Sequence, residues 1–251
     1  MLDLIRHGEI LELNLARPPA NALDPELVGK LRVAIESAPA HGVRALLLSG
    51  RPGMFSAGLD VPALLRLDRS GMTVFWHEFF ALCAALARSP IPIAAAITGH
   101  SPAGGAVLAI FCDYRVMANG PFKIGLNEVQ VGLCVPANIQ FALRRLVGTY
   151  RAERLLVVGA MVDATEALRV GFVDEVAEPE QVVPRAREWL EGLLKLPAQA
   201  MTNTRRIARA DLADAFADAR AFAIDDFVDA WFSAESQATL KALVARLKSG
   251  K

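Results

Sequence analysis

The sequence lacks a net charge, long apolar segments and a recognisable leader. It carries 27 Lys and Arg residues against 27 Asp and Glu residues, so no strong field attracts nucleic acid or an anionic membrane. Its longest apolar runs, such as GGAVLAIFC, are far shorter than the roughly 20 residues of a spanning helix. The first residues have no apolar signal core, and the final KSGK is not a peroxisomal address. These absences predict a soluble, cytoplasmic protein with no nucleic-acid and no membrane partner.

Residues that bind metals, form disulfides or bind phosphates are equally scarce. The three cysteines, Cys83, Cys112 and Cys134, are odd in number, lie in apolar surroundings and have no ligand spacing such as C-x2-C, which predicts reduced, buried thiols. The four histidines are scattered without ligand spacing, so no metal site is predicted. Neither G-x-x-x-x-G-K-[ST] nor G-x-G-x-x-G occurs, and no cofactor is predicted.

The pattern of apolar residues predicts an α/β fold. Leu11, Leu13 and Leu15 alternate with polar residues, as in a half-buried strand. Two stretches then share one layout, in which an apolar strand (VRALLLSG, IPIAAAITG) passes through a small-residue loop into a helix. Between them, MTVFWHEFFALCAALARS predicts a buried helix. We expect an α/β core over residues 1–178 and a mostly helical region over 179–251, whose aromatic residues mainly pack.

The segment GHSPAG imitates the nucleophile turn of serine hydrolases, but the details exclude that chemistry. The residue after the serine must donate its amide to the oxyanion, and here it is Pro102, which has no amide hydrogen. The histidine of that fold lies downstream of the serine, whereas all four histidines precede Ser101.

Two small-residue loops are the first candidate for chemistry. SAGLD at 56–60 and PAGG at 102–105 each lead into a predicted helix, where free backbone amides point outward. If the loops lie side by side, one amide from each can hold a carbonyl oxygen as it becomes an oxyanion. The alternative is that the glycines only form tight turns.

One acid, Glu128, is the second candidate, because it stands in the apolar run IGLNEVQVGLCVP. Burying an ionised carboxylate without a partner costs several kcal/mol or raises its pKa. Together with two amides, such an acid suits abstraction of a proton next to a carbonyl and stabilisation of the enolate. The alternative is a structural ion pair with Arg144 or Arg145.

The segments RPGMFSAGLDV, GHSPAGGAVLAIFCDYRVMA and IGLNEVQVGLCVP resemble the crotonase, or enoyl-CoA hydratase/isomerase, superfamily. Within it, SAGLD, PAGG, CDYR and IGLNE look most like the mitochondrial-type Δ3,Δ2-enoyl-CoA isomerases. The resemblance implies a crotonase-like spiral of repeated ββα units with a helical C-terminal trimerisation region. It also implies an acyl-CoA thioester substrate, no cofactor beyond the coenzyme A of that substrate, and a homotrimer or hexamer.

The resemblance assigns roles to individual residues. Leu59 and Gly104 match the two amide donors of an oxyanion hole, and Glu128 matches the catalytic base. The substrate-binding residues that it implies are Ala57, Gly58, Asp60, Val61 and Asn127.

Val107 decides between the activities of this superfamily. The resemblance implies that a hydratase of this superfamily uses two carboxylates. The first of them lies three residues after the position of Gly104, where this sequence has Val107. An isopropyl group can neither orient nor deprotonate water, so we predict an isomerase of fatty-acid β-oxidation. Two alternatives stay open: a hydratase or other lyase whose second acid lies elsewhere, and a non-catalytic acyl-CoA-binding protein. Residues 137–145 lack the bulkier aromatic residues of the mitochondrial isomerases, which leaves the acyl length open.

Overall fold

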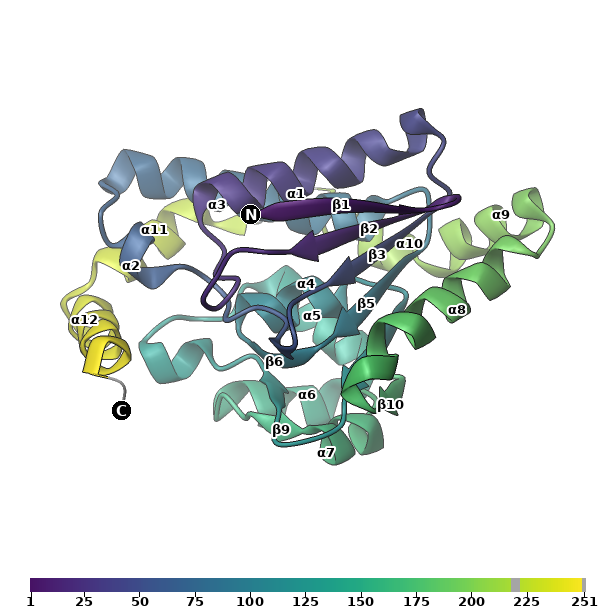
Figure 1. The fold of residues 1–251 in the computed structure, drawn as a ribbon. Coiled ribbons are helices and arrows are strands. Elements are labelled where there is room, and N and C mark those ends of the chain that lie inside the picture. The colour runs from purple at the N-terminus through teal and green to yellow at the C-terminus, as the bar shows by residue number, and fades with distance from the viewer. Residues whose placement is uncertain (218–221, 250–251) are drawn as a thin grey trace.

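Two β-sheets form the fold, and the chain alternates between them (Figure 1). The computed structural model describes residues 1–217 and 222–249. The larger sheet contains, in spatial order, β1 (Leu2–His7), β2 (Ile10–Leu15), β3 (Ala45–Ser49), β5 (Ile93–Ile97), β7 (Tyr114–Ala118) and β10 (Glu175–Ala177). The smaller sheet contains, in spatial order, β4 (Gly53–Met54), β6 (Gly99–Pro102), β8 (Lys123–Gly125) and β9 (Val162–Asp163).

Helices follow the paired strands and cover the sheets. The α-helices are α1 (Pro25–Ser37), α2 (Val61–Leu64), α3 (Arg69–Arg88), α4 (Gly104–Ile110), α5 (Ala137–Val147), α6 (Thr149–Val157), α7 (Ala164–Val170), α8 (Val182–Leu194), α9 (Ala198–Ala208), α10 (Ala210–Asp214), α11 (Ile224–Phe232) and α12 (Ala234–Ser249). The 3-10 helices that lie wholly within the described residues are η1 (Ala38–His41), η2 (Glu128–Val131) and η3 (Pro179–Gln181).

The repeating unit of the chain is strand, strand, helix. Each of β3–β4, β5–β6 and β7–β8 places its first strand in the larger sheet and its second strand in the smaller sheet, before a helix follows. The α/β class predicted from the apolar pattern and the spiral of ββα units implied by the family resemblance are therefore confirmed. Both sequence stretches with the strand, loop, helix layout correspond to such units.

The larger sheet is buried on both faces because its inner strands are apolar throughout. Along β3, Leu46 and Leu48 face the core shared with α1 and α3, whereas Ala45 and Leu47 face α8. Such continuous apolar runs are typical of parallel strands covered on both sides. Figure 1 shows α1 and α3 over one side of this sheet and α8 on the other.

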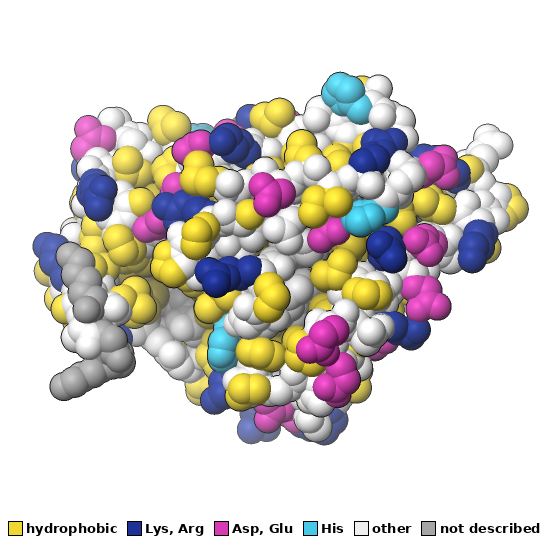
Figure 2. Space-filling view, viewed as in Figure 1, with side chains coloured by type: hydrophobic (Ala, Val, Ile, Leu, Met, Phe, Trp, Pro, Cys, Tyr) yellow, Lys and Arg dark blue, Asp and Glu magenta, His cyan; other side chains and the backbone are white. Residues whose placement is uncertain are grey.

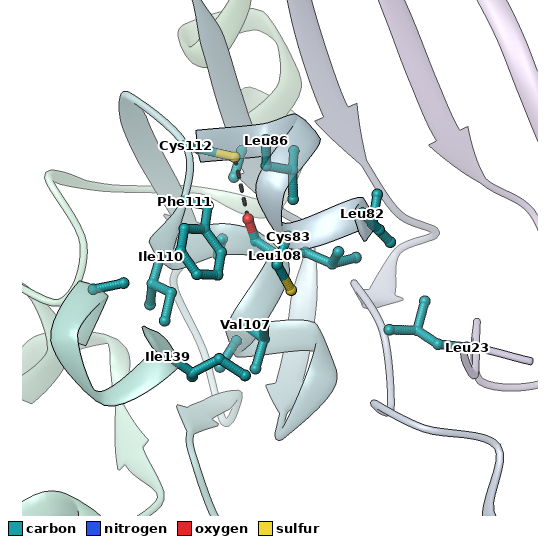
Figure 3. Close-up of a cluster of buried hydrophobic side chains, with 14 of the residues drawn as sticks. Leu23, Leu82, Cys83, Leu86, Val107, Leu108, Ile110, Phe111, Cys112 and Ile139 are labelled. Carbon is teal, nitrogen blue, oxygen red and sulfur yellow. Dashed lines mark hydrogen bonds between the residues drawn. The ribbon is translucent and has the colours of Figure 1, made fainter. Parts of the chain in front are cut away.

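Helix α3 is the predicted buried helix. By length and composition it is the one helix, among the residues that the structure describes, that could cross a membrane. Half of its 18-residue apolar window is buried in the protein, and Leu82, Cys83 and Leu86 pack against α4 in the cluster of Figure 3. A core helix of a soluble protein passes the same test, so α3 gives no argument for a membrane span.

The cysteine prediction is right for two residues and wrong for one. Cys83 and Cys112 are buried, and burial raises the pKa of the Cys112 thiol to about 12. Cys134 is exposed instead, because it lies in the loop between η2 and α5 and not in the core.

The strand β1 was not predicted. Its middle residues are exposed, including the apolar Leu4 and Ile5, so no buried face marks it in the sequence. Residues 218–221 and 250–251 of the predicted helical region 179–251 lie outside the described residues. The predicted boundary at 178/179 falls between β10 and η3.

Two glycines should respond oppositely to alanine. A Cβ on Gly99 would lie 1.9 Å from the carbonyl carbon of Gly53, whereas a Cβ on Gly192 in α8 meets nothing within 4 Å. We expect Gly99→Ala to lower the free energy of unfolding by more than ~2 kcal/mol and Gly192→Ala to raise it by ~0.5–1 kcal/mol. Denaturant unfolding measures both. Equal effects of the two substitutions would contradict this view of the β4–β6 contact.

Candidate active site

The smaller sheet brings three chain segments to one place. Strand β4 pairs with β6 in parallel, and β6 pairs in parallel with β8. The chain therefore leaves all three strands at the same edge of the sheet. The loop 55–60, the start of α4 and the segment that carries Glu128 follow these strands.

The two small-residue loops touch. Gly58 has a φ of +81°, and a Cβ on it would lie 2.9 Å from the amide nitrogen of Gly104. A side chain at Gly58 would push the loops apart, so this glycine does more than form a turn. The expectation that the loops lie side by side is confirmed.

Both candidate amides are free. The backbone of Leu23 pairs with the segment around Leu59 as in a parallel sheet. Leu23 N donates to Gly58 O at 2.8 Å, and Leu23 O accepts from Asp60 N at 3.0 Å. This pattern leaves the Leu59 amide without an acceptor in the described residues. Gly104 is the first residue of α4, where an amide has no partner within the helix, and none is found elsewhere in the described chain.

A cavity of about 690 Å³ connects these groups. Of the predicted site residues, all but Gly58 line it; Gly58 lies behind, against Gly104. Its walls come from the β2–α1 loop, α2, α3, α4, the η2 region, α5, α11 and α12. Figure 2 shows the surface hollowed on the side where α12 lies. The lining residues are mostly apolar, which suits an acyl chain.

Glu128 is the desolvated acid of the cavity. Its Oε2 is buried without a hydrogen-bond partner in the described structure. Burial raises the pKa of this carboxyl from 4.5 to about 7, because the ionised form loses its hydration. The alternative ion pair is not found, since Arg145 pairs with Asp211 at 2.8 Å and Arg144 donates to Gln140 at 3.1 Å.

A second acid, Asp60, also lines the cavity but has other partners. Its Oδ1 caps α2 by accepting from Ala63 N at 2.9 Å, and its Oδ2 pairs with Arg17 at 2.7 Å. Val107 lines the cavity near the start of α4 and is 1 % exposed, packed in the cluster that includes Ile139 (Figure 3). Glu128 is thus the one carboxylate among the described lining residues without a polar partner.

Asn21 is a residue of the site region that sequence reasoning missed. It is fully buried with a φ of +51°, and its Nδ2 donates to Phe55 O at 3.1 Å. Its own carbonyl accepts from Ser56 Oγ at 2.8 Å, and Ser56 Oγ accepts from Gly58 N at 3.2 Å. Asn21 therefore holds the loop that presents Leu59. Asparagine tolerates positive φ, but nothing in the sequence indicated which asparagine would do so.

The C-terminal helices also reach the cavity. Phe227 of α11 and Leu243 of α12 line it, and Phe227 lies 5.6 Å from Trp76 between ring centres. Trp231 is fully buried, so the expected packing role of the aromatic residues holds for it. Phe227 both packs against Trp76 and lines the cavity. Ile139 lines the cavity too, so the stretch 137–145 reaches the cavity wall.

The chain is similar to known proteins over almost its whole length. The family described as Enoyl-CoA hydratase/isomerase matches residues 6–250. The human protein named enoyl-CoA delta isomerase 1, mitochondrial, is 32% identical over 244 residues, 95% of this chain and 80% of that protein. A Thermus thermophilus protein named putative enoyl-CoA hydratase is 34% identical over 191 residues, 74% of this chain and 75% of that protein.

Solved structures agree with the fold. Human mitochondrial Δ3-Δ2-enoyl-CoA isomerase superposes with a TM-score of 0.94 at 30% identity, covering 100% of this chain and 99% of that chain. An enoyl-CoA hydratase from Mycobacterium ulcerans has a TM-score of 0.79 at 28% identity, covering 91% and 96%.

The Asn21 contacts predict a local loosening on substitution. Asn21→Gly keeps the positive φ but removes the side-chain hydrogen bonds to the loop. We expect the amides of Ala57 and Gly58 to exchange with deuterium about tenfold faster, because each lost hydrogen bond lowers the cost of opening by ~1 kcal/mol. Hydrogen exchange measures this, with β5 as the internal control. Unchanged exchange at residues 57–58 would show that Asn21 does not hold the loop.

The raised pKa of Glu128 predicts a pH-dependent stability. The folded-state pKa lies above 4.5. The contribution of this group to the free energy of unfolding is therefore complete below about pH 4.5 and is lost as the pH rises through about 7. Glu128→Gln removes that loss. We expect the variant to be ~2–3 kcal/mol more stable than the wild type at pH 8, with little difference at pH 4. Denaturant unfolding at both pH values tests this, and a difference independent of pH would be inconsistent with a desolvated carboxylate.

Proposed function

This chain belongs to the enoyl-CoA hydratase/isomerase family, and from that premise we propose that it is a Δ3,Δ2-enoyl-CoA isomerase. Its substrate is a 3-enoyl-CoA thioester, and its product is the conjugated 2-trans-enoyl-CoA. The observation that carries the proposal is the unpartnered Glu128 carboxylate oxygen in an apolar cavity that Leu59 and Gly104, the residues with the two free amides, also line.

Glu128 acts as the base that moves one proton. Its carboxylate removes a proton from C2 of the substrate, and the pair of electrons shifts toward the thioester oxygen. The protonated Glu128 then returns the proton at C4, and the double bond forms between C2 and C3. A pKa of about 7 suits both halves of this cycle near neutral pH.

The Leu59 and Gly104 amides stabilise the enolate by donating to its oxygen, and they form the oxyanion hole. Ala57, Gly58, Asp60 and Val61 belong to the segment along which coenzyme A binds, and Asn127 lies beside the acid in the acyl pocket. Arg17 and Asp60 are tied to each other at 2.7 Å, which supports a fixed cavity wall at this position.

Isomerisation is favoured over hydration by Val107. Hydration needs a second group to position or deprotonate water, and Val107 lines the cavity where the sequence pattern of hydratases has an acid. Asp60 is the other acid of the wall, and its oxygens are engaged by Arg17 and Ala63 N.

The likeness to relatives named mitochondrial isomerases supports a place in fatty-acid β-oxidation, where unsaturated acyl-CoA needs this step. The homotrimer or hexamer and the cytoplasmic location stay predictions. The mammalian relatives carry the word mitochondrial in their names.

One assay distinguishes the candidate functions. The protein is incubated with 3-enoyl-CoA and separately with 2-enoyl-CoA, and the ultraviolet absorbance of the conjugated thioester is followed. We expect absorbance to rise with the first and to persist with the second. We expect Glu128→Gln to lower the rate by at least about 1,000-fold, because no other group takes the proton. Loss of absorbance from 2-enoyl-CoA would indicate hydration, and no change with either substrate would leave only binding.

A further inference from the structure

The turn that carries Glu128 has little hydrophobic anchoring. None of the four residues of η2 is buried, although the buried carboxylate oxygen of Glu128 has no hydrogen-bond partner in the described structure. No polar contact therefore fixes this oxygen directly. Its position depends on how the backbone of η2 is held.

Helix α12 holds η2 from one side. Ser236, which is 2 % exposed, donates its Oγ hydrogen to Gly132 O at 2.6 Å. A Cβ on Gly132 would lie 3.2 Å from the Cα of Ser236, so the two backbones are in close approach. Ser233 supports this arrangement, since its Oγ accepts from Ser236 N at 3.2 Å.

Gly132 connects this contact to the acid. It caps the end of η2 with a φ of +76°, and its amide donates to the carbonyl oxygens of Glu128 and Val129. Leu133 N also donates to Glu128 O at 3.0 Å. A displacement of Gly132 would therefore move the backbone of Glu128.

A second contact holds η2 at the end of α6. Gln130 Nε2 donates to Gly159 O at 2.9 Å, and a Cβ on Gly159 would lie 2.9 Å from Val129 Cγ2. Because the α6 end packs this closely, η2 has a fixed wall on that side. Ser236 supplies the matching contact from α12.

We propose that Ser236 is a positioning residue for Glu128, and that α12 thereby sets the geometry of the base from 108 positions away in the chain. This inference rests on the proposed function, since it concerns the base of that reaction. The same helix lines the cavity through Leu243 and Leu247 and packs on α2. Packing of α12 therefore closes the cavity and, at the same time, positions the base.

The test compares Ser236→Ala with Thr239→Ala. Thr239 lies one turn further along α12 and donates to Glu235 O of its own helix at 3.0 Å, so it is a control for removing a hydroxyl from this helix. Without the Ser236 contact, η2 moves and water reaches the carboxylate. We expect kcat to fall roughly tenfold with little change in KM, and the acid limb of the pH profile to move by about one unit toward pH 4.5.

A second measurement is independent of catalysis. Carbon-13 NMR of glutamate-labelled protein, assigned with Glu128→Gln, follows the titration of Glu128 directly. Among the described residues that line the cavity, the other titratable groups are Arg17, Asp60 and Cys134. Helix α12 also carries Glu235, Lys241 and Arg246, and Ser236→Ala leaves all of these groups in place. We expect the pKa of Glu128 to fall in Ser236→Ala and to stay at the wild-type value in Thr239→Ala.

These readouts separate two failures. If the wild type has no isomerase activity but the NMR shift appears, the proposed function fails and the contact stands. If Ser236→Ala keeps both the wild-type kcat and the wild-type titration, or if Thr239→Ala changes them equally, the positioning role is wrong. Should Ser236→Ala unfold, Ser236→Cys retains the side-chain size with a weaker donor, and the same two readouts apply.

Discussion

Desolvation of one carboxylate is the constraint on which this site depends. Glu128 loses hydration without gaining an ion pair or a hydrogen bond at Oε2, and its pKa rises to about 7 as a result. The folded protein is less stable at neutral pH for this reason, because an ionised group is kept in an apolar place. Catalytic bases often have such shifted pKa values, because burial that lowers the stability of the fold also brings the pKa near the pH at which a proton is transferred. The surrounding structure is consistent with that role.

The architecture explains how a short turn can carry such a group. The chain alternates between two sheets, which places β4, β6 and β8 side by side. The segment that follows each of these strands carries one part of the site, at the same edge of the sheet. Buried contacts from distant segments then fix these components. Asn21 holds the Leu59 loop, the Gly58 and Gly104 backbones touch, and Ser236 contacts the end of the Glu128 turn. The candidate groups lie on a loop, on η2 and at the start of α4, and the contacts that hold them come from the β2–α1 loop and from α12.

The sequence predicted the parts of this protein that have a local signal. Apolar strands, the buried helix α3 and the two small-residue loops each show in a few consecutive residues, and the acid is conspicuous because its neighbours are apolar. The spatial adjacency of the loops was an expectation that only strand pairing could verify. Gly58 and Gly104 show why, since their contact joins residues 46 positions apart.

Features that depend on long-range packing could not be predicted. Asn21 and Ser236 are ordinary polar residues until the fold buries them against distant carbonyls. Cys134 was predicted buried because its neighbours are apolar, yet those apolar neighbours line a cavity and the thiol is exposed. An apolar run can therefore belong to a cavity wall and not only to the core. The contribution of α11 and α12 to the cavity is likewise invisible in their sequence.

Isotope transfer tests the central claim of a single desolvated base most directly. A 3-enoyl-CoA thioester with deuterium at C2 is converted in ordinary water under single-turnover conditions, and the product is analysed for deuterium at C4. A lone carboxylate in a cavity that excludes water should deliver a measurable share of the deuterium from C2 to C4. Conversion with no deuterium at C4 would mean that water or a second acid supplies the proton, and would contradict the account.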